Sequence, residues 1–291
     1  APTGVVELIV EPSTLELFRE QRVIDNVFEV PMNTGVILRS NISSASILAI
    51  SRGDSLVRCE DSPRLYNMNA RGARQIIAAN LLASHYIGLG DEFLGSLSGR
   101  AGSGKTSLAI SAGLQGIRDN RWDSIVVFRS TESVGKDLGF LPGTLDEKMQ
   151  PWTLAVGDVL RGLNFDEKHF RDVTDTEKSS LVFTSDSQQA GGLISVESIN
   201  HVRGRTLNNC FVIVDEAQNL EPTVVRTVLS RLGRGSAGVL CWDETQVDNP
   251  FIRGDENSGP KKVLREVLPN NMAWHIELQG CERGGVSALI H

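Results

Sequence analysis

Residues 99–106 read Gly99-Arg100-Ala101-Gly102-Ser103-Gly104-Lys105-Thr106, which fits the phosphate-binding pattern GxxxxGK[ST]. Glycines at these positions let the backbone curl, so that successive N–H groups point inward at a phosphate. In this pattern Lys105 brings a mobile positive charge to the β- and γ-phosphates, and the hydroxyl of Thr106 binds Mg²⁺. The stretch therefore predicts a site for the phosphates of a nucleotide bound with Mg²⁺.

The residues on either side of this stretch support the same interpretation. Phe93–Leu97 is a short apolar run typical of a strand, and a helix is expected over Ser107–Gln115. Such a helix adds its positive N-terminal end to the phosphate site, and Ser107 at its start joins the predicted nucleotide contacts. The alternative, a glycine loop that only precedes a helix, is disfavoured because a strand and a helix flank the motif as phosphate binding requires.

A second apolar run ends in two carboxylates at Cys210-Phe211-Val212-Ile213-Val214-Asp215-Glu216-Ala217-Gln218. A buried parallel strand delivers its C-terminal residue to the ligand crevice beside the phosphate loop. Asp215 is then placed to hold Mg²⁺ through water, and Glu216 to orient and deprotonate the attacking water. An acidic helix cap is the alternative. Gln218, just beyond the carboxylates, is suited to sensing the γ-phosphate.

Polar residues also follow the predicted strand at Val239–Trp242. We expect Asp243 and Gln246, in the segment Asp243-Glu244-Thr245-Gln246-Val247-Asp248, to report on the state of the bound nucleotide. An ordinary acidic loop is the alternative interpretation of this segment.

The chain alternates between strands and helices after residue 62, which predicts a mostly parallel sheet covered on both faces. Further strands are expected at Ser124–Phe128 and His275–Leu278, and a helix at about Ala73–Ser84. Residues 1–62 are predicted to form a small β-rich accessory domain, and residues 63–291 the main α/β domain. The segment from Asn164 to Gly192 is interpreted as a solvated excursion.

Composition excludes some classes of function and leaves others open. No apolar run is long enough to span a bilayer and no secretory signal pattern is present, so we expect a cytoplasmic protein without membrane contacts. The four cysteines are scattered, which disfavours a zinc site. The net charge of −7 means that nucleic-acid binding would need a local basic groove. The first residue is Ala, and we expect the chain to be a piece of a longer protein.

Taken together, these motifs resemble those of a helicase-type, RecA-like motor and, more specifically, of the PhoH-like ATPases. The stretch Leu138-Gly139-Phe140-Leu141-Pro142-Gly143 carries much of this resemblance. It is continued by Glu147-Lys148, Pro151-Trp152, Arg203-Gly204-Arg205-Thr206-Leu207, Gln246 with Asp248-Asn249-Pro250, and Glu282-Arg283. At the front, Ile37-Leu38-Arg39-Ser40 and Leu56-Val57-Arg58 are similar to the long form of the family, in which a PIN ribonuclease domain precedes this region.

The sequence departs from the family pattern in three places. Arg129 is followed by Ser130 where the family has Pro, and Trp242 precedes Asp243 where the family has Gly. The resemblance makes Gln75 a contact of the adenine base, but its expected acidic neighbour is Arg74. These departures bear on rate, coupling and base preference more than on nucleotide binding.

The resemblance implies a RecA-like P-loop fold and ATP hydrolysis with Mg²⁺ that is coupled to remodelling or unwinding of RNA. Ribonuclease activity is implied only where the PIN domain is present, and residues 1–62 show no clustered-acid nuclease pattern. The length after the P-loop suffices for one lobe, so an arginine that stabilises the transition state must come from elsewhere in the lobe or from a neighbouring subunit. We therefore expect a ring-like homo-oligomer.

The sequence leaves several arginines as candidates for that role. Arg205 or Arg231 is favoured as a finger in trans, and Arg283 nearer its own site. Arg203 and Arg234 are further candidates. For each of them, a surface arginine without a catalytic role is the alternative.

A second group of residues is predicted to contact nucleic acid. Phe140, Trp152 and Lys148 are suited to stack on and follow a single strand, and Arg129 and Arg203 are included in this group. The alternative is that the two aromatic residues belong to the core. Two rival functions also remain, namely a nucleotide-dependent switch or scaffold without translocation and, with less support, a P-loop kinase.

Overall fold

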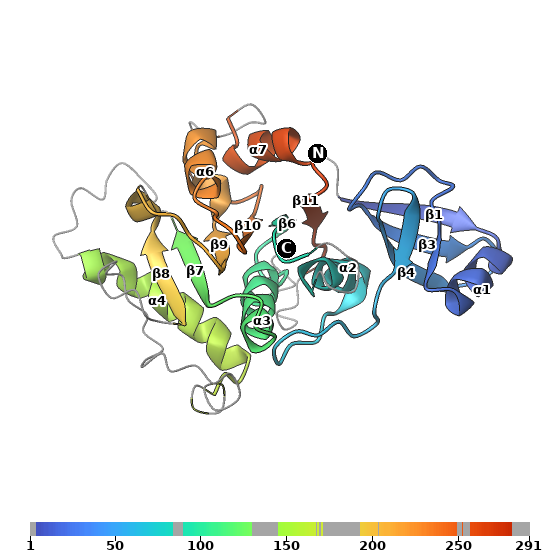
Figure 1. Cartoon of the computed structure of the whole chain (residues 1–291), viewed down its shortest axis with the longest axis horizontal. Helices are drawn as coiled ribbons and strands as arrows, with labels where there is room; N and C mark the ends of the chain where they lie inside the picture. Colours follow the sequence, from blue (N-terminus) through green and yellow to red (C-terminus); the bar gives the residue numbers. More distant parts are fainter. Residues whose placement is uncertain are drawn as a thin grey trace.

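A computed structural model of the chain describes residues 4–83, 90–129, 145–166, 168, 170, 193–202, 204–248, 252 and 257–280. Figure 1 shows two units, a small β-rich unit at the N-terminus and a larger α/β unit. Among the residues that the structure describes, no helix combines the length and apolar character that crossing a membrane requires.

The N-terminal unit is a five-stranded mixed sheet in the order β1-β3-β4-β5-β2. Helix α1 packs on it through Leu15 and Phe18, which lie in one hydrophobic cluster with residues of β3, β4 and β5. The elements are β1 (Val5–Val10), α1 (Pro12–Glu20), β2 (Val23–Asp25), β3 (Gly35–Ser40), β4 (Ser46–Ser51) and β5 (Ser55–Arg58).

The larger unit is built on a six-stranded sheet in which every strand pairing is parallel, in the order β11-β6-β10-β9-β7-β8. This confirms the predicted α/β class, with a mostly parallel sheet in a P-loop fold preceded by a β-rich part. The strands are β6 (Leu94–Ser98), β7 (Ser124–Arg129), β8 (Ile194–Ser198), β9 (Cys210–Asp215), β10 (Ala237–Trp242) and β11 (Ala273–Glu277).

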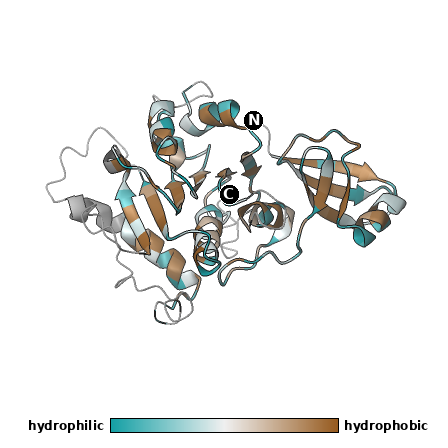
Figure 2. Ribbon diagram, in the orientation of Figure 1, coloured by the Kyte–Doolittle hydropathy of each residue, from teal (hydrophilic) through white to brown (hydrophobic). Residues whose placement is uncertain are grey.

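Helices cover both faces of this sheet (Figure 1), because alternate strand residues are apolar on each side. Ile125 and Ile213 face the cluster that includes α2, α3 and α4, whereas Val126 and Val214 face the cluster of α6 and α7. Figure 2 shows the apolar residues concentrated on the strands. The helices are α2 (Gly72–Ala83), α3 (Lys105–Arg118), α4 (Leu145–Gly162), α6 (Pro222–Leu229) and α7 (Gly259–Val267).

The two units are joined at strand β11. The side-chain amide of Asn33 donates to the carbonyl oxygens of Asn271 (2.8 Å) and Ala273 (2.9 Å). Gly4 adopts φ +72°, and a Cβ there would lie 1.6 Å from the carbonyl oxygen of His275, so only glycine allows this approach. The N-terminal unit is thereby held against the edge of the parallel sheet.

Several elements of the larger unit, among them α4, β8, α6 and α7, were not expected from the sequence. Helix α4 begins among the residues of the family signature, and β8 forms the edge of the sheet next to β7. The segment interpreted as a solvated excursion, together with Leu138–Gly143 and Ser130, lies almost entirely outside the described residues.

Candidate active site

The site lies at the carboxyl ends of the central strands of the parallel sheet. Strand β6 ends at Ser98 and leads into the P-loop, β9 ends at Asp215, and β7 ends at Arg129. The register pairs Arg129 with Asp215 and Ser98 with Trp242, so the ends of four neighbouring strands meet at one edge. This edge lines a cavity of about 810 Å³, which is large enough for a nucleotide-sized ligand.

The P-loop turns through glycines in backbone conformations that other residues rarely adopt. Gly99, Gly102 and Gly104 have φ of 143°, 81° and 90°. A Cβ on Gly99 would lie 2.6 Å from the carbonyl oxygen of Leu278, so a larger residue would push the loop away from β11. Helix α3 begins directly after Gly104, which places its positive N-terminal end at the cavity.

The lysine of the loop lies across its own backbone. The ammonium group of Lys105 donates to the carbonyl oxygens of Gly99 (2.6 Å) and Arg100 (3.0 Å), and the residue lines the cavity. Ala101, Gly102 and Ser107 line the same cavity. The positive charge of Lys105 therefore lies at the cavity, as binding of phosphates by this residue would require.

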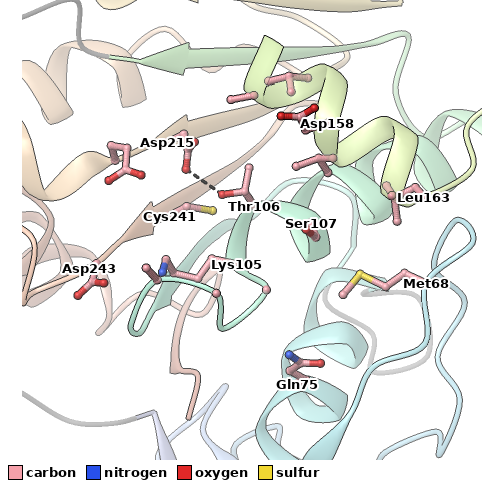
Figure 3. Close-up of a pocket in the computed structure, with 18 of the residues that line it drawn as sticks. Met68, Gln75, Lys105, Thr106, Ser107, Asp158, Leu163, Asp215, Cys241 and Asp243 are labelled. Atoms are coloured by element: carbon pink, nitrogen blue, oxygen red, sulfur yellow. Dashed lines mark hydrogen bonds between the residues drawn. The ribbon is translucent and has the colours of Figure 1, made fainter. Parts of the chain in front are cut away.

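The two residues predicted to hold the metal, Thr106 and Asp215, contact each other. The Thr106 hydroxyl donates to Oδ1 of Asp215 at 3.0 Å, which Figure 3 shows as a dashed line between the two side chains. Asp215 is only 8% exposed, and its burial raises the pKa of its carboxyl, an effect that the nearby Arg129 opposes. Hydroxyl and carboxylate oxygens are hard ligands that suit Mg²⁺, which usually keeps waters and binds the phosphates of its nucleotide as well.

Glu216 stands at the start of a tight turn. Its backbone adopts φ 53° and ψ 38°, the left-handed region that is costly for a residue other than glycine. Gln218 orients the carboxylate, because its side-chain amide donates to Oε2 of Glu216 (2.5 Å) and to the carbonyl oxygen of Gln246 (3.2 Å). Gln218 also accepts from the backbone N–H of Asp243 at 3.0 Å. A single buried amide thus joins the predicted base to the predicted sensing segment.

Two buried polar atoms lie near the P-loop. Within the part of the chain that the structure describes, the Ser103 hydroxyl and Oδ2 of Asp243 are buried side-chain oxygens without a hydrogen-bond partner. Asp243 lines the cavity, and its other oxygen accepts from the backbone N–H and the hydroxyl of Thr245. Buried oxygens of this kind are costly unless a ligand, an ion or water satisfies them.

Gln75 supports the P-loop from helix α2. It is 3% exposed, its Oε1 accepts from the backbone N–H of Arg71 (2.8 Å), and its Nε2 donates to the carbonyl oxygen of Ser103 (2.9 Å). Figure 3 shows Gln75 and Met68 on one side of the cavity, with Asp158 and Leu163 of the α4 region on another. The helix α2 end of the cavity is where the resemblance places the adenine base.

Comparison with known proteins agrees with this geometry. The model of the family described as PhoH-like protein matches residues 70–287. The chain belongs to this family. The predicted resemblance to PhoH-like ATPases is thereby confirmed, and together the family and the P-loop site support ATPase activity.

Several relatives are similar to the chain over nearly its whole length. Protein PhoH2 of Mycolicibacterium smegmatis is 35% identical over 99% of this chain and 61% of its own length. Protein PhoH2 of Thermobispora bispora is 36% identical over 99% of this chain and 62% of its own length, and Protein PhoH2 of Bacillus subtilis is 34% identical over 85% and 52%. The chain therefore spans less than two thirds of the length of these relatives.

Among solved structures, an ATPase domain matches with a TM-score of 0.26 and 13% identity, over 60% of this chain and 67% of that chain. A similarity this low carries no argument about either fold or function. The fold of this PhoH-like chain rests on its own sheet and P-loop.

Trp242 departs from the family pattern and lines the cavity. It is 3% exposed, its indole N–H donates to the Ser96 hydroxyl at 2.9 Å, and its ring stacks on His275 with centroids 5.8 Å apart. Ser96 and His275 thus fix the orientation of the ring at the edge of the cavity.

The predicted arginine fingers lie away from the chain's own cavity. Arg205 pairs with Oε2 of the buried Glu197 at 2.6 Å, and the carbonyl oxygens of Arg231 and Arg234 accept from the backbone N–H groups of Leu207 and Asn209. Among the described residues, none of these three arginines lines the cavity. Arg203 and Arg283 lie outside the described residues.

The residues predicted to contact nucleic acid fall into two groups. Phe140 lies outside the described residues, and Lys148 belongs to α4 with a side chain that also lies outside them. Arg129 and Trp152 are described and contact each other, and Arg129 lines the nucleotide cavity. Arg129 thus stands beside the predicted metal and base residues, a location that sequence spacing did not indicate.

Other lining residues were missed by sequence reasoning altogether. Cys241 lines the cavity as a fully buried thiol, and burial raises its pKa well above the ordinary value. Asn67 and Met68 line it from the segment before α2, and Val159 and Leu163 from the α4 region. No motif marks these positions, because they meet the P-loop only after the chain has folded.

Proposed function

We propose that this PhoH-like chain hydrolyses ATP with Mg²⁺ and couples the reaction to remodelling or unwinding of RNA. The contact between the Thr106 hydroxyl and Asp215, with Glu216 and Lys105 on the same cavity, is the observation that carries the ATPase part. The RNA part rests on the resemblance of the chain to the long form of the family.

The residues divide the work of hydrolysis among them. The N–H groups of the P-loop and the Lys105 ammonium bind the phosphates, and Thr106 and Asp215 would hold Mg²⁺, which supplies charge neutralisation when it is bound. Glu216 orients the attacking water and accepts its proton. Gln218 keeps Glu216 in place and transmits a shift of Asp243 or Gln246 to it, because it is hydrogen-bonded to all three residues.

The assembly that we propose is a ring-like homo-oligomer of a cytoplasmic protein. Arg205 and Arg231 lie outside the cavity of their own chain, which is consistent with a role in the site of a neighbouring subunit. In the full-length protein a PIN nuclease domain would precede residues 1–62, which we propose as an accessory domain to the ATPase domain of residues 63–291.

A switch or scaffold that binds nucleotide without moving along a strand is the second candidate. The bulky Trp242, at a position where the family has glycine, favours it, and this ring lines the cavity while packing against His275 and Ser96. The acidic balance of the chain, with a net charge of −7, favours it as well.

The deciding experiment is the steady-state ATPase rate with and without single-stranded RNA, with Glu216→Gln as the blank. A rate that RNA stimulates, and that the variant lacks, is the expected result. Basal hydrolysis that is indifferent to RNA would favour the switch, and a rate equal to that of the blank would contradict the ATPase itself. Single-stranded DNA of the same sequence serves as the control for the type of nucleic acid.

A further inference from the structure

Arg129 stands between the two carboxylates of the site and an aromatic ring. Its Nη1 lies 3.5 Å from Oδ2 of Asp215, and its Nη2 lies 3.5 Å from Oε1 of Glu216. On the other side its guanidinium carbon lies 4.3 Å from the centre of the Trp152 ring. Strand β7 supplies the arginine, β9 the carboxylates and helix α4 the ring, so three elements far apart in sequence fix one guanidinium.

These partners position the guanidinium without using all of its hydrogen-bond donors. Both ion-pair distances exceed the 2.7–2.9 Å that is usual for a tight hydrogen bond between charged groups. A guanidinium has five N–H donors, and these two contacts leave others available. The side chain is about one-fifth exposed and lines the nucleotide cavity, so its charge faces the space that the ligand enters.

Arg129 lies in the part of the cavity where the reacting phosphate of a nucleotide would bind. Glu216 must lie beside the attacking water, and the attacked phosphoryl group lies next to that water, so a cation that contacts Glu216 is close to both. Among the described residues, Arg71 is the other arginine that lines the cavity. It lies near the N-terminus of α2, where its backbone N–H binds Gln75.

We propose that Arg129 is the arginine that this chain supplies to its own ATP site to stabilise the transferring phosphoryl group. This inference rests on the proposed ATPase function and deepens it. In the ATP-bound site the guanidinium shifts part of its hydrogen bonding from Asp215 and Glu216 to the phosphoryl oxygens. Arginine suits this role because its planar fork binds phosphate oxygens through two parallel hydrogen bonds.

Trp152 is a positioning residue for this arginine. A flat ring that faces the guanidinium holds its plane in place without using any of its N–H donors. The resemblance had placed Trp152 and Arg129 in the group that contacts nucleic acid. Because α4 carries the ring, a displacement of that helix would move the guanidinium relative to the phosphates.

The test measures binding as well as turnover, with the full chain and Arg129→Gln, Arg129→Lys and the exposed control Arg226→Gln. The probes are ADP alone and ADP with aluminium fluoride and Mg²⁺, which imitates the transferring phosphoryl group. We expect Arg129→Gln to bind ADP within about twofold of wild type but to lose turnover on the order of 10³-fold, as for arginines of this kind. It should also lose the tight complex with aluminium fluoride. Arg226→Gln, which removes only an exposed pair with Glu266, should match wild type.

Arg129→Lys guards against a folding defect, because it keeps a positive charge opposite the buried carboxylates. It should fold and bind ADP as wild type does, yet still lose the aluminium fluoride complex, since a lysine ammonium lacks the fork. At Trp152, replacement by Leu should lower turnover several-fold, whereas replacement by Phe should restore most of it. Mixing Arg129→Gln with Glu216→Gln subunits should give no more activity than the separate proteins, because both groups serve the same chain's site.

The outcomes separate the two proposals. If wild type is active and Arg129→Lys and Arg129→Gln form the aluminium fluoride complex as tightly as wild type, Arg129 does not serve the phosphoryl group and this inference falls alone. Restored activity in the mixture would also overturn it, because the arginine would then act on a neighbour. If wild type binds ADP but neither hydrolyses ATP nor forms the complex, the proposed ATPase function falls as well.

Discussion

At the scale of single residues, the site depends on a few side chains whose surroundings differ sharply. Glu216 adopts a left-handed backbone conformation, which costs on the order of 1–3 kcal/mol and persists only where the surrounding structure demands it. Gln218, 2% exposed, holds its carboxylate from the next turn. Lys105, by contrast, donates to carbonyl oxygens of its own loop, bonds that a phosphate can replace.

Lys105 and Glu216 should therefore fail in different ways when they are replaced. Lys105→Ala should abolish tight binding of ATP with Mg²⁺, because the positive charge that the ammonium group brings to the phosphates is lost. Glu216→Gln should keep binding and lower turnover by roughly 10²–10⁴-fold, since an amide cannot accept the proton of water. Titration with a fluorescent ATP analogue, together with phosphate release, measures both effects. Turnover of Glu216→Gln comparable to wild type would show that another group is the base.

His275 should make the stability of the folded protein fall as the solution becomes acidic. Burial lowers its pKa from 6.5 to about 4, so the folded protein holds it neutral while the unfolded chain takes up a proton below pH 6.5. Its contribution to stability is full above pH 6.5 and is lost between pH 6.5 and 4, by about 3 kcal/mol at most. Denaturant unfolding of wild type and His275→Gln at pH 7.5 and pH 4.5 measures this. The difference in free energy of unfolding between wild type and His275→Gln should shrink at the lower pH. An unchanged difference would show that His275 does not cause the loss of stability.

At the scale of elements, the P-loop is held in place by the helices and strands around it. Helix α2 reaches it through Gln75, which binds Ser103 on one side and Arg71 on the other. The residue after strand β11 supports it as well, because Gly99 lies against Leu278. The loop is thus fixed at both ends of its turn by segments that are distant in sequence.

Gln75 offers a test of whether α2 reads the base or only supports the loop. Its carbonyl oxygen and its amide are each already bonded to backbone, so we expect Gln75→Ala to weaken ATP and GTP alike, by roughly tenfold each for the loss of one to two hydrogen bonds. Binding of the two nucleotides to the variant and to wild type is measured by calorimetry. A loss confined to ATP would instead support the adenine contact that the resemblance implies.

At the scale of the whole molecule, the larger unit carries the predicted phosphate and carboxylate residues, and the N-terminal unit is joined to it at β11. Asn33 bonds two carbonyl oxygens of that region, so the two units are connected through the strand at one end of the parallel sheet. The opposite end is formed by β8, where Arg205 pairs with Glu197. Arg231 and Arg234, by contrast, bond Leu207 and Asn209 just before β9, near the middle of the sheet.

A finger in trans has a distinct signature in mixed assemblies. We expect Arg231→Ala to lower turnover at least tenfold without weakening nucleotide binding, because its own cavity lacks contact with that residue. Mixed with Glu216→Gln, it should recover part of the activity, since one subunit then supplies the base and its neighbour the arginine. Phosphate release from the mixture at several ratios measures this. A mixture no more active than the sum of its parts would count against a finger at Arg231.

The sequence by itself determined the fold class, and it predicted the central residues of the site. The P-loop at residues 99–106 and the strand that ends at Asp215 are local patterns, in which the residue types and their spacing already state the geometry. Apolar strands that alternate with helices likewise dictate a parallel sheet, and the structure has one. The family followed from these motifs together with other stretches, above all Leu138-Gly139-Phe140-Leu141-Pro142-Gly143.

Only the tertiary structure decided which side chains complete the site. The sheet order places the end of β7 next to the end of β9, and so brings Arg129 to Asp215 across 86 residues of sequence. Helix α4 then places the ring of Trp152 against Arg129. Neither contact can be predicted from a periodicity or a spacing in the sequence, because strand order and helix packing depend on the whole core and not on any one segment.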